Sequence, residues 1–277
     1  MSADPQDLRH FSGDLVLVGA GKMGTALLEG WLRLGLEPRR IVVIEPQPGA
    51  PIAPLIERGV RLNPAPATLG TVAALVIAVK PQIAAPAMAP LVTLISDATV
   101  VVSIMAGRTL HFLADTLRRP CALVRAMPNT PAAIGRGITV AVPRNVSAAQ
   151  RALADRLLAA TGGVEWIEDE RLMDAVTAVS GSGPAYVFLL AETLARAGAA
   201  AGLPPALAAR LARDTVSGAG ELLHRSALDA ASLRENVTSP GGTTAAALAV
   251  LMAEPGLEGL MHRAVAAATQ RSRELAG

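Results

Sequence analysis

The chain reads Leu15-Val16-Leu17-Val18-Gly19-Ala20-Gly21-Lys22-Met23-Gly24 near its start, and this stretch decides the fold of its first half. A run of β-forming residues meets a Gly-x-Gly-x-x-Gly pattern and an amphipathic stretch over 23–34, which predicts a strand, a tight turn and a helix. In this setting Gly19 permits the turn, Gly21 lets a pyrophosphate approach the backbone, and Gly24 lets the helix lie close to the strand. The six residues from Gly19 to Gly24 are therefore predicted to bind a dinucleotide. The alternative is a glycine-rich turn without a ligand.

The alternation of β-branched runs and helical stretches continues to residue 167, which is typical of a parallel sheet covered on both faces. Helices are expected between the strands, among them 148–160 with Ser147 as its N-cap. The predicted fold class is an α/β, Rossmann-type domain. Strands are expected at 14–18, 41–44, 74–79, 99–104, 122–126, 138–142 and 164–167.

From about residue 168 the strand pattern disappears, and Ala/Leu-rich helical stretches broken by Gly and Pro follow. We therefore predict a dinucleotide-binding domain over 1–168 and an all-α domain over 169–277. Because aromatic residues make up 2% of the chain and the helices carry few polar positions, burial against a second copy is expected. The helical domain is predicted to form a homodimer, from which a higher oligomer can be built. Helices are expected at 170–180, 184–201, 204–225, 229–236, 243–253 and 256–275.

Composition excludes several classes of partner. The 277 residues include 25 basic and 23 acidic ones, and a net charge of +2 is too small to indicate nucleic acid or an anionic membrane as a partner. The most apolar stretch, 73–95, is interrupted by Lys80 and by prolines, so no membrane span is predicted. Cys121 is the single cysteine and the four histidines show no metal-ligand spacing, so neither a disulfide nor a metal site is expected. The start of the chain lacks the pattern of a secretory signal, and the cytoplasm is the expected compartment.

A carboxylate is predicted beside the adenine ribose of the dinucleotide. Glu45 ends the second expected strand, roughly 20 residues after the glycine pattern, where an acidic side chain accepts hydrogen bonds from ribose hydroxyls. A carboxylate there repels a 2′-phosphate, and residues 46–48 supply no cation. NADH is therefore favoured over NADPH. The alternatives are that Glu45 is a solvated strand end, or that Arg58 folds back from the next helix to bind a phosphate.

Two more segments follow strands and are expected to face the same crevice. Lys80, in Val79-Lys80-Pro81, can serve a ribose or a phosphate, or can equally extend into solvent from a strand end. Lys22, the other lysine of the chain, is interpreted as a solvated residue of the glycine turn. The run Met127-Pro128-Asn129-Thr130-Pro131 is stiffened by its prolines and is expected to border the nicotinamide end, with a merely structural turn as the alternative.

The helical half contains two glycine-rich segments at helix starts, Ser180-Gly181-Ser182-Gly183-Pro184 and Thr238-Ser239-Pro240-Gly241-Gly242-Thr243-Thr244. Each is expected to present unpaired backbone N–H groups, which suit a substrate carboxylate. For the first segment the alternative is helix capping, with Ser182 as the cap and Pro184 at the first helical position. For the second segment, a cap alone explains two glycines and two threonines less well.

Residues 174–186, Asp-Ala-Val-Thr-Ala-Val-Ser-Gly-Ser-Gly-Pro-Ala-Tyr, and residues 237–244 closely resemble pyrroline-5-carboxylate reductases. The glycine turn, Ala78-Val79-Lys80-Pro81 and Met127-Pro128-Asn129-Thr130-Pro131 agree with this family in the same order. The resemblance covers 14–275 and is most specific at 239–244. Lys22 departs from it, because it stands where asparagine is common in the family.

The resemblance implies the last step of proline synthesis, in which hydride passes from NADH or NADPH to the C5 carbon of Δ1-pyrroline-5-carboxylate. It implies that the backbone around Gly242 and Thr243 holds the substrate carboxylate, and that Thr244 makes the catalytic contact, to the ring nitrogen. It also implies intertwined dimers, in which each cleft combines one subunit's dinucleotide domain with its partner's helices. The predicted substrate contacts are Ser182, Ser239, Gly241, Gly242, Thr243 and Thr244, and the predicted cofactor contacts beyond the glycine turn and Glu45 are Ala78, Val79, Lys80, Pro81 and Asn129.

Two other functions are weighed against this one. A related two-domain hydroxyacid dehydrogenase needs a catalytic lysine in its helical half, and no lysine follows Lys80. A non-catalytic dinucleotide sensor would bind the cofactor but leave 239–244 without a ligand. Oxidation of the reduced cofactor when the cyclic imine is added distinguishes the three.

Overall fold

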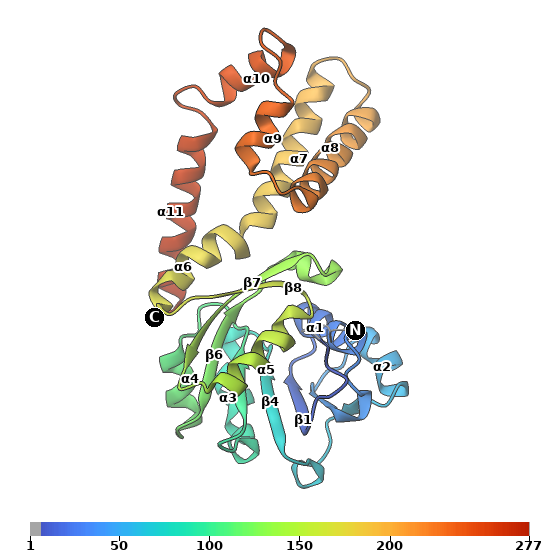
Figure 1. Cartoon of the computed structure of the whole chain (residues 1–277), viewed down its shortest axis with the longest axis vertical. Helices are drawn as coiled ribbons and strands as arrows, with labels where there is room; N and C mark the ends of the chain where they lie inside the picture. Colours follow the sequence, from blue (N-terminus) through green and yellow to red (C-terminus); the bar gives the residue numbers. More distant parts are fainter. Residues whose placement is uncertain (1–6, 277) are drawn as a thin grey trace. The chain divides into compact units, whose positions relative to one another are not determined.

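A single sheet organises the first part of the chain in the computed structural model, which describes residues 7–276 (Figure 1). Its strand order is β3-β2-β1-β4-β5-β6-β7-β8, so the order reverses beside β1, where sheets of this kind bind dinucleotides. The α/β fold class predicted from the sequence is confirmed. The strands are β1 (Asp14–Val18), β2 (Ile41–Ile44), β3 (Arg61–Leu62), β4 (Val72–Ile77), β5 (Val100–Ser103), β6 (Ala122–Met127), β7 (Gly137–Arg144) and β8 (Gly162–Trp166).

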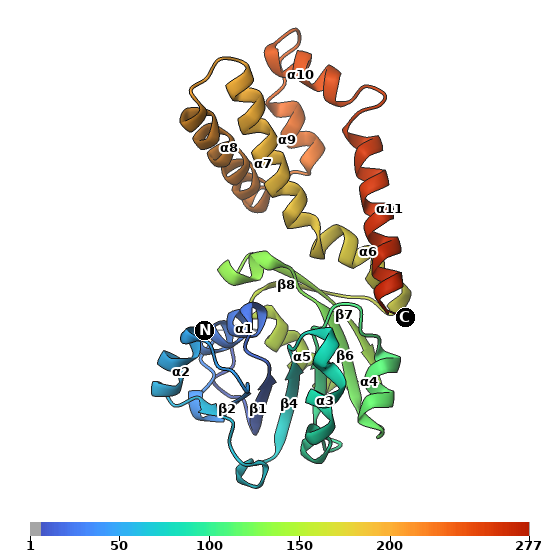
Figure 2. The same cartoon turned by 180° about the vertical axis from the view of Figure 1, so that it is seen from behind.

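Helices cover both faces of the sheet, because side chains alternate along each buried strand. Leu15 and Leu17 of β1 pack in one apolar cluster with α1 and α5, whereas Val16 and Val18 pack in a second cluster with α3 and α4 (Figures 1 and 2). Ser147 caps α5 as predicted, through a reciprocal pair of hydrogen bonds with Gln150. These helices are α1 (Lys22–Arg33), α2 (Ala53–Glu57), α3 (Ala84–Met88), α4 (Leu110–Leu117) and α5 (Ala148–Ala159).

Two features of the sheet differ from the prediction. β7 runs antiparallel to β6, with Leu123 opposite Arg144, whereas the sequence predicts a parallel sheet. The connection from Met127 to Gly137 is shorter than the dozen or so residues that a parallel crossover requires. β3 is absent from the predicted strands, because a strand of two residues shows no periodicity.

The contacts divide the chain into two compact units, of which the first runs to Gly181 and takes in the chain again from Thr269, and the second is Ser182–Ala268. The sequence places the boundary earlier, at 168. Residues 170–181 are helical but pack with the sheet, since Met173 is buried in its core. The remaining helices are α6 (Met173–Val176), α7 (Gly183–Ala200), α8 (Pro205–Arg225), α9 (Ala230–Asn236), α10 (Thr243–Leu251) and α11 (Leu257–Ala276).

The last turns of α11 belong to the first unit through a polar contact with α6. The hydroxyl of Ser272, a buried residue, donates a hydrogen bond to Asp174 Oδ1 at 2.7 Å. A single helix therefore runs from one unit into the other. Among the helices that the structure describes, none is long and apolar enough to span a membrane.

The glycine-rich segment at 180–184 is helical, and the expectation of a loop there is wrong. α6 continues directly into a π-helical turn, Thr177–Gly181, and α7 begins at Gly183. Ser182 does occupy the N-cap position of α7, as the capping alternative has it, and Pro184 is the second helical residue. The dihedral angles of Ser182 are helical, however, and its side chain makes no capping hydrogen bond. Gly181 therefore closes a widened helical turn, whereas Gly183 stands at the start of α7, as the sequence predicts.

Candidate active site

The glycine turn joins β1 to α1 at the carboxyl edge of the sheet. Gly19 has a φ of +93°, and a Cβ at this position would lie 2.7 Å from the carbonyl oxygen of Ala78. A Cβ on Gly24 would collide with the carbonyl oxygen of Gly19, so only glycine lets α1 begin this close to the strand. By contrast, apart from Gly21 itself and its two neighbours in the chain, no described residue has an atom within 4 Å of the place where a Cβ on Gly21 would stand, and Gly21 is exposed. The turn thus leaves open space where a pyrophosphate would approach the first N–H groups of α1.

Glu45 follows β2 at the same edge, and its carboxylate lies against the glycine turn. Oε2 accepts a hydrogen bond from the N–H of Ala20 at 2.9 Å, and Oε1 accepts one from the N–H of Gln47 at 3.0 Å. Asn63, which the sequence-based prediction missed, bonds the backbone of Glu45 with both ends of its side-chain amide. The signal available for Asn63 is an Asn-Pro pair typical of a turn, and it does not indicate this contact.

The segment after β4 runs beside the glycine turn. The N–H of Ala78 donates to the last carbonyl of β1 at 2.7 Å, and the side chain of Lys80 is exposed. Arg108, also missed from the sequence, donates two hydrogen bonds to the carbonyl oxygen of Pro81, at 3.2 and 2.9 Å. This arginine fixes the backbone immediately after Lys80, so the cation projects from an anchored segment at the carboxyl edge.

The Met127–Asn129 segment ends β6 at the same edge of the sheet. Asn129 Oδ1 accepts a hydrogen bond from the N–H of Ile138 at 3.0 Å, which ties the loop to β7. The Cε of Met127 lies 2.6 Å from the position that a Cβ on Gly181 would occupy, so the π-helical turn packs closely against the end of β6. The structure therefore gathers the glycine turn, Glu45, Ala78–Pro81 and Asn129, all predicted cofactor contacts, along one edge.

The second unit carries the other predicted segment, at 238–244, as a tight turn before α10. Gly241 has a φ of +71°, and the N–H of Gly242 donates to the carbonyl of Ser239 at 3.0 Å. Gly242 is the N-cap of α10 and has no side chain with which to cap it. The turn thus delivers the chain into the helix without a side-chain acceptor for the helix N–H groups.

The N-terminus of α10 presents free backbone donors. The first hydrogen bond of the helix runs from the N–H of Ala246 to the carbonyl of Gly242, at 3.2 Å. The N–H groups that precede it, beginning with those of Thr243 and Thr244, have no acceptor within the helix. Thr244 is half-buried and Thr243 is exposed. This geometry suits a carboxylate, which gains both the N–H donors and the helix dipole.

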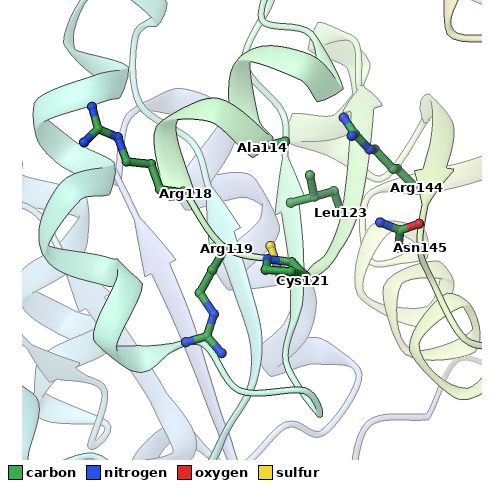
Figure 3. Close-up of a pocket in the computed structure, with 8 residues that line it drawn as sticks. Ala114, Arg118, Arg119, Cys121, Leu123, Arg144 and Asn145 are labelled. Atoms are coloured by element: carbon green, nitrogen blue, oxygen red, sulfur yellow. The ribbon is translucent and has the colours of Figure 1, made fainter.

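A cavity of about 330 Å³ lies elsewhere, at the end of the sheet where β6 begins (Figure 3). Arg118, Arg119 and Arg144 line it together with Cys121, but the guanidinium groups of Arg118 and Arg119 point away from the thiol (Figure 3). These cations therefore do not converge on one ligand. Burial raises the pKa of the Cys121 thiol above its ordinary value, against the opposing charges of Arg119 and Arg144. Among the described residues, no group of three or more His, Cys, Asp and Glu side chains could hold a metal ion.

Comparison with known families finds two matches along the chain. The family described as pyrroline-5-carboxylate reductase dimerisation matches residues 170–275, and the family described as NADP oxidoreductase, coenzyme F420-dependent, matches residues 14–107. The chain is 38% identical over 266 residues to a pyrroline-5-carboxylate reductase of Pseudomonas aeruginosa, a match that covers 95% of this chain and 96% of the relative. It is 40% identical over 267 residues to one of Synechocystis sp., covering 94% and 97% of the two chains.

Solved structures are similar over the same extent. A pyrroline-5-carboxylate reductase of Coxiella burnetii matches with a TM-score of 0.88 and 31% identity, covering 96% of this chain and 99% of the other. A pyrroline carboxylate reductase of Plasmodium falciparum with NADP bound matches with a TM-score of 0.78 and 27% identity, again covering 96% and 99%. Fold and sequence therefore agree over nearly the whole chain.

Proposed function

This chain belongs to the pyrroline-5-carboxylate reductase family. From that premise we propose which of its residues bind the cofactor, which bind the substrate and which form the dimer. It is an oxidoreductase that reduces Δ1-pyrroline-5-carboxylate to proline with NAD(P)H, in proline biosynthesis. In our proposal residues 1–168 bind the dinucleotide, and residues 169–277 bind the imine and form the dimer. The proposal rests on the N-terminus of α10, whose N–H groups no side chain caps and which can therefore bind a carboxylate. The same chain has a glycine turn with open space for a dinucleotide.

The dinucleotide fits the glycine turn because the space over Gly21 is open while Gly19 and Gly24 are closely packed. We assign its pyrophosphate to the N–H groups at the start of α1 and its adenine ribose to Glu45. Lys80 is exposed on the neighbouring segment, where its ammonium group can neutralise phosphate charge. The nicotinamide end is assigned to the Met127–Asn129 loop. When bound, the dinucleotide supplies the hydride for the reduction.

The cofactor preference that we propose is NADH. The Glu45 carboxylate lies 2.9 Å from the N–H of Ala20, so a 2′-phosphate near the turn would meet a fixed negative charge. At a separation of about 4 Å two like charges near a protein surface repel by roughly 4 kcal/mol, before screening by salt. A 2′-hydroxyl instead donates a hydrogen bond to the same carboxylate.

The imine is held by α10 in this proposal. Its carboxylate accepts hydrogen bonds from the free N–H groups at Thr243 and Thr244, and the Thr244 hydroxyl bonds the ring nitrogen as it becomes an amine. No strongly shifted acid is required, because the ring nitrogen itself carries the proton. Most of the acceleration then comes from orientation, for which effective molarities reach roughly 10⁵–10⁸ M.

The second unit is proposed to form a homodimer. None of the residues of α7 is buried, and its exposed side chains include Val187, Phe188, Leu189 and Leu190. Four consecutive exposed apolar residues point to different sides of the helix, so α7 is apolar around much of its circumference, as expected of a helix that another subunit covers. The match of residues 170–275 to a dimerisation family supports the same assembly.

The role of Thr244 is tested with two substitutions at one position. Thr244→Ala should lower kcat/KM for the imine by about 5- to 150-fold, the equivalent of about 1–3 kcal/mol for a buried hydrogen bond. Thr244→Ser keeps the hydroxyl and should recover most of the activity, and neither change should alter the Kd for NADH. Unchanged kinetics in Thr244→Ala would remove Thr244 from the mechanism.

A further inference from the structure

Asn63 extends the β2–β3 ladder by one step with its side chain. The two strands pair at Val42 with Arg61 and at Val43 with Leu62, and the N–H of Asn63 donates to the carbonyl of Val43 at 2.9 Å. Beyond this point the side-chain amide replaces the backbone. Asn63 Oδ1 accepts from the N–H of Glu45 at 2.9 Å, and Nδ2 donates to the carbonyl of Glu45 at 2.9 Å.

The residue type suits this arrangement for two reasons. Asn63 has a φ of +45°, a left-handed conformation that asparagine tolerates better than most residues. A side-chain amide also offers one acceptor and one donor on the same planar group, whereas aspartate lacks the donor and serine lacks the reach. The pair of bonds therefore fixes the backbone of Glu45 on both its N–H and its carbonyl side.

The fixed backbone determines where the Glu45 carboxylate stands. Glu45 lies just past the last residue of β2, where the ladder with β1 has ended at Ile44. Its carboxylate nevertheless reaches the N–H of Ala20, and this bond joins residues 25 positions apart in sequence. Without the two side-chain hydrogen bonds from Asn63, no pairing with β3 would hold the backbone after Ile44.

We propose that Asn63 is a positioning residue for nucleotide selection, which holds Glu45 so that the site prefers dinucleotides with a free 2′-hydroxyl over those with a 2′-phosphate. In this proposal Asn63 acts through the backbone of Glu45, to which both of its side-chain hydrogen bonds run. The inference rests on the proposed role of Glu45 in selecting NADH.

The test compares the ratio of kcat/KM with NADH to kcat/KM with NADPH in four proteins: wild type, Asn63→Gly, Glu45→Gln and the double variant. Glycine adopts positive φ without strain, so Asn63→Gly removes the amide and keeps the backbone conformation accessible. The ratio should fall by about three- to tenfold in Asn63→Gly, the range of one net hydrogen bond. It should fall at least as far in Glu45→Gln, and the double variant should match Glu45→Gln alone.

Asn145→Gly is the matched control. Asn145 is also exposed and has a φ of +57°, but it follows β7 at the opposite edge of the sheet, among the residues around the Cys121 cavity (Figure 3). Its substitution should leave the cofactor ratio unchanged. KM for the imine, measured in each variant, reports general damage to the enzyme and should stay constant.

The outcomes distinguish the positioning role of Asn63 from the selection of NADH by Glu45. A ratio that is unchanged in Glu45→Gln would show that Glu45 does not select the cofactor, and the proposed NADH preference would fail together with its mechanism. A ratio that changes in Glu45→Gln but not in Asn63→Gly would overturn the role of Asn63 alone. An effect of Asn63→Gly that persists in full in the Glu45→Gln background would also overturn it, because Asn63 would then act independently of Glu45.

Discussion

Substitution of the first two glycines of the turn by alanine should separate folding from cofactor binding. At Gly19 the new Cβ would lie 2.7 Å from the carbonyl oxygen and 2.8 Å from the carbonyl carbon of Ala78, at a φ of +93°. The left-handed conformation costs roughly 1–2 kcal/mol and the overpacking about 1–3 kcal/mol. At Gly21 the new Cβ meets no atom within 4 Å among the described residues other than its own chain neighbours, and the φ of −68° is open to alanine. The residual cost is that of alanine at an N-cap, about 0.5–1 kcal/mol.

These magnitudes give opposite expectations for two measurements. For a domain of this size each kcal/mol lowers Tm by roughly 2–4 °C, so Gly19→Ala should lose about 4–20 °C and Gly21→Ala about 1–4 °C. The Kd for NADH should instead rise about 10- to 100-fold in Gly21→Ala, or about 1.4–2.7 kcal/mol, because the methyl group occupies the space assigned to the pyrophosphate.

The assay is thermal unfolding without nucleotide, followed by titration with NADH at a temperature where both variants are folded. Wild-type affinity in Gly21→Ala would refute the assignment of the pyrophosphate to this turn. A loss of stability in Gly21→Ala as large as that in Gly19→Ala would refute the packing argument.

Three further predictions follow from single contacts. Cys121 should react slowly with iodoacetamide at neutral pH and faster as the pH rises above its ordinary pKa, because burial raises the pKa of the thiol; a rate equal to that of the unfolded chain at pH 7 would contradict this. Ser147→Ala removes the acceptor for the N–H of Gln150 and should cost about 0.5–2 kcal/mol in thermal unfolding, and an unchanged Tm would show that the cap does not contribute. Phe188→Asp places a charge on the exposed apolar face of α7 and should shift sedimentation toward the monomer, whereas an intact dimer would place the interface on another surface.

Local sequence is sufficient to predict an element when the residues at both of its ends mark where it begins and stops. β1 and β2 begin and end at the predicted residues, because β-branched runs stop at glycine or at a charged residue in both cases. The glycine turn could be predicted for the same reason, because its three glycines lie within six residues and each has a steric role. Glu45, Lys80 and Asn129 could also be placed together from the sequence. Each follows a strand, and the carboxyl ends of parallel strands lie at the same edge of a sheet.

Hydrogen bonds between residues far apart in the sequence could not be predicted from local patterns. The bond between Asn63 and Glu45 joins positions 18 apart, and the pair from Arg108 to Pro81 joins positions 27 apart. No local pattern marks either residue. The direction of β7 was readable in principle from the short connection after Met127, but the apolar pattern of a buried strand is the same in both directions. Likewise, glycines at 181 and 183 indicate a break between helices by propensity, and the π-helical turn that runs up to Gly181 has no local signature in the sequence.

This chain reduces Δ1-pyrroline-5-carboxylate to proline with a reduced nicotinamide cofactor. The most direct test supplies purified protein with NADH and the imine, and measures cofactor oxidation and proline formation together, with hydroxyacid and ketoacid substrates in parallel. One proline should form for each NADH oxidised, and no oxidation should occur with the other substrates. Cofactor binding without imine-dependent oxidation, or oxidation with a ketoacid instead, would contradict it.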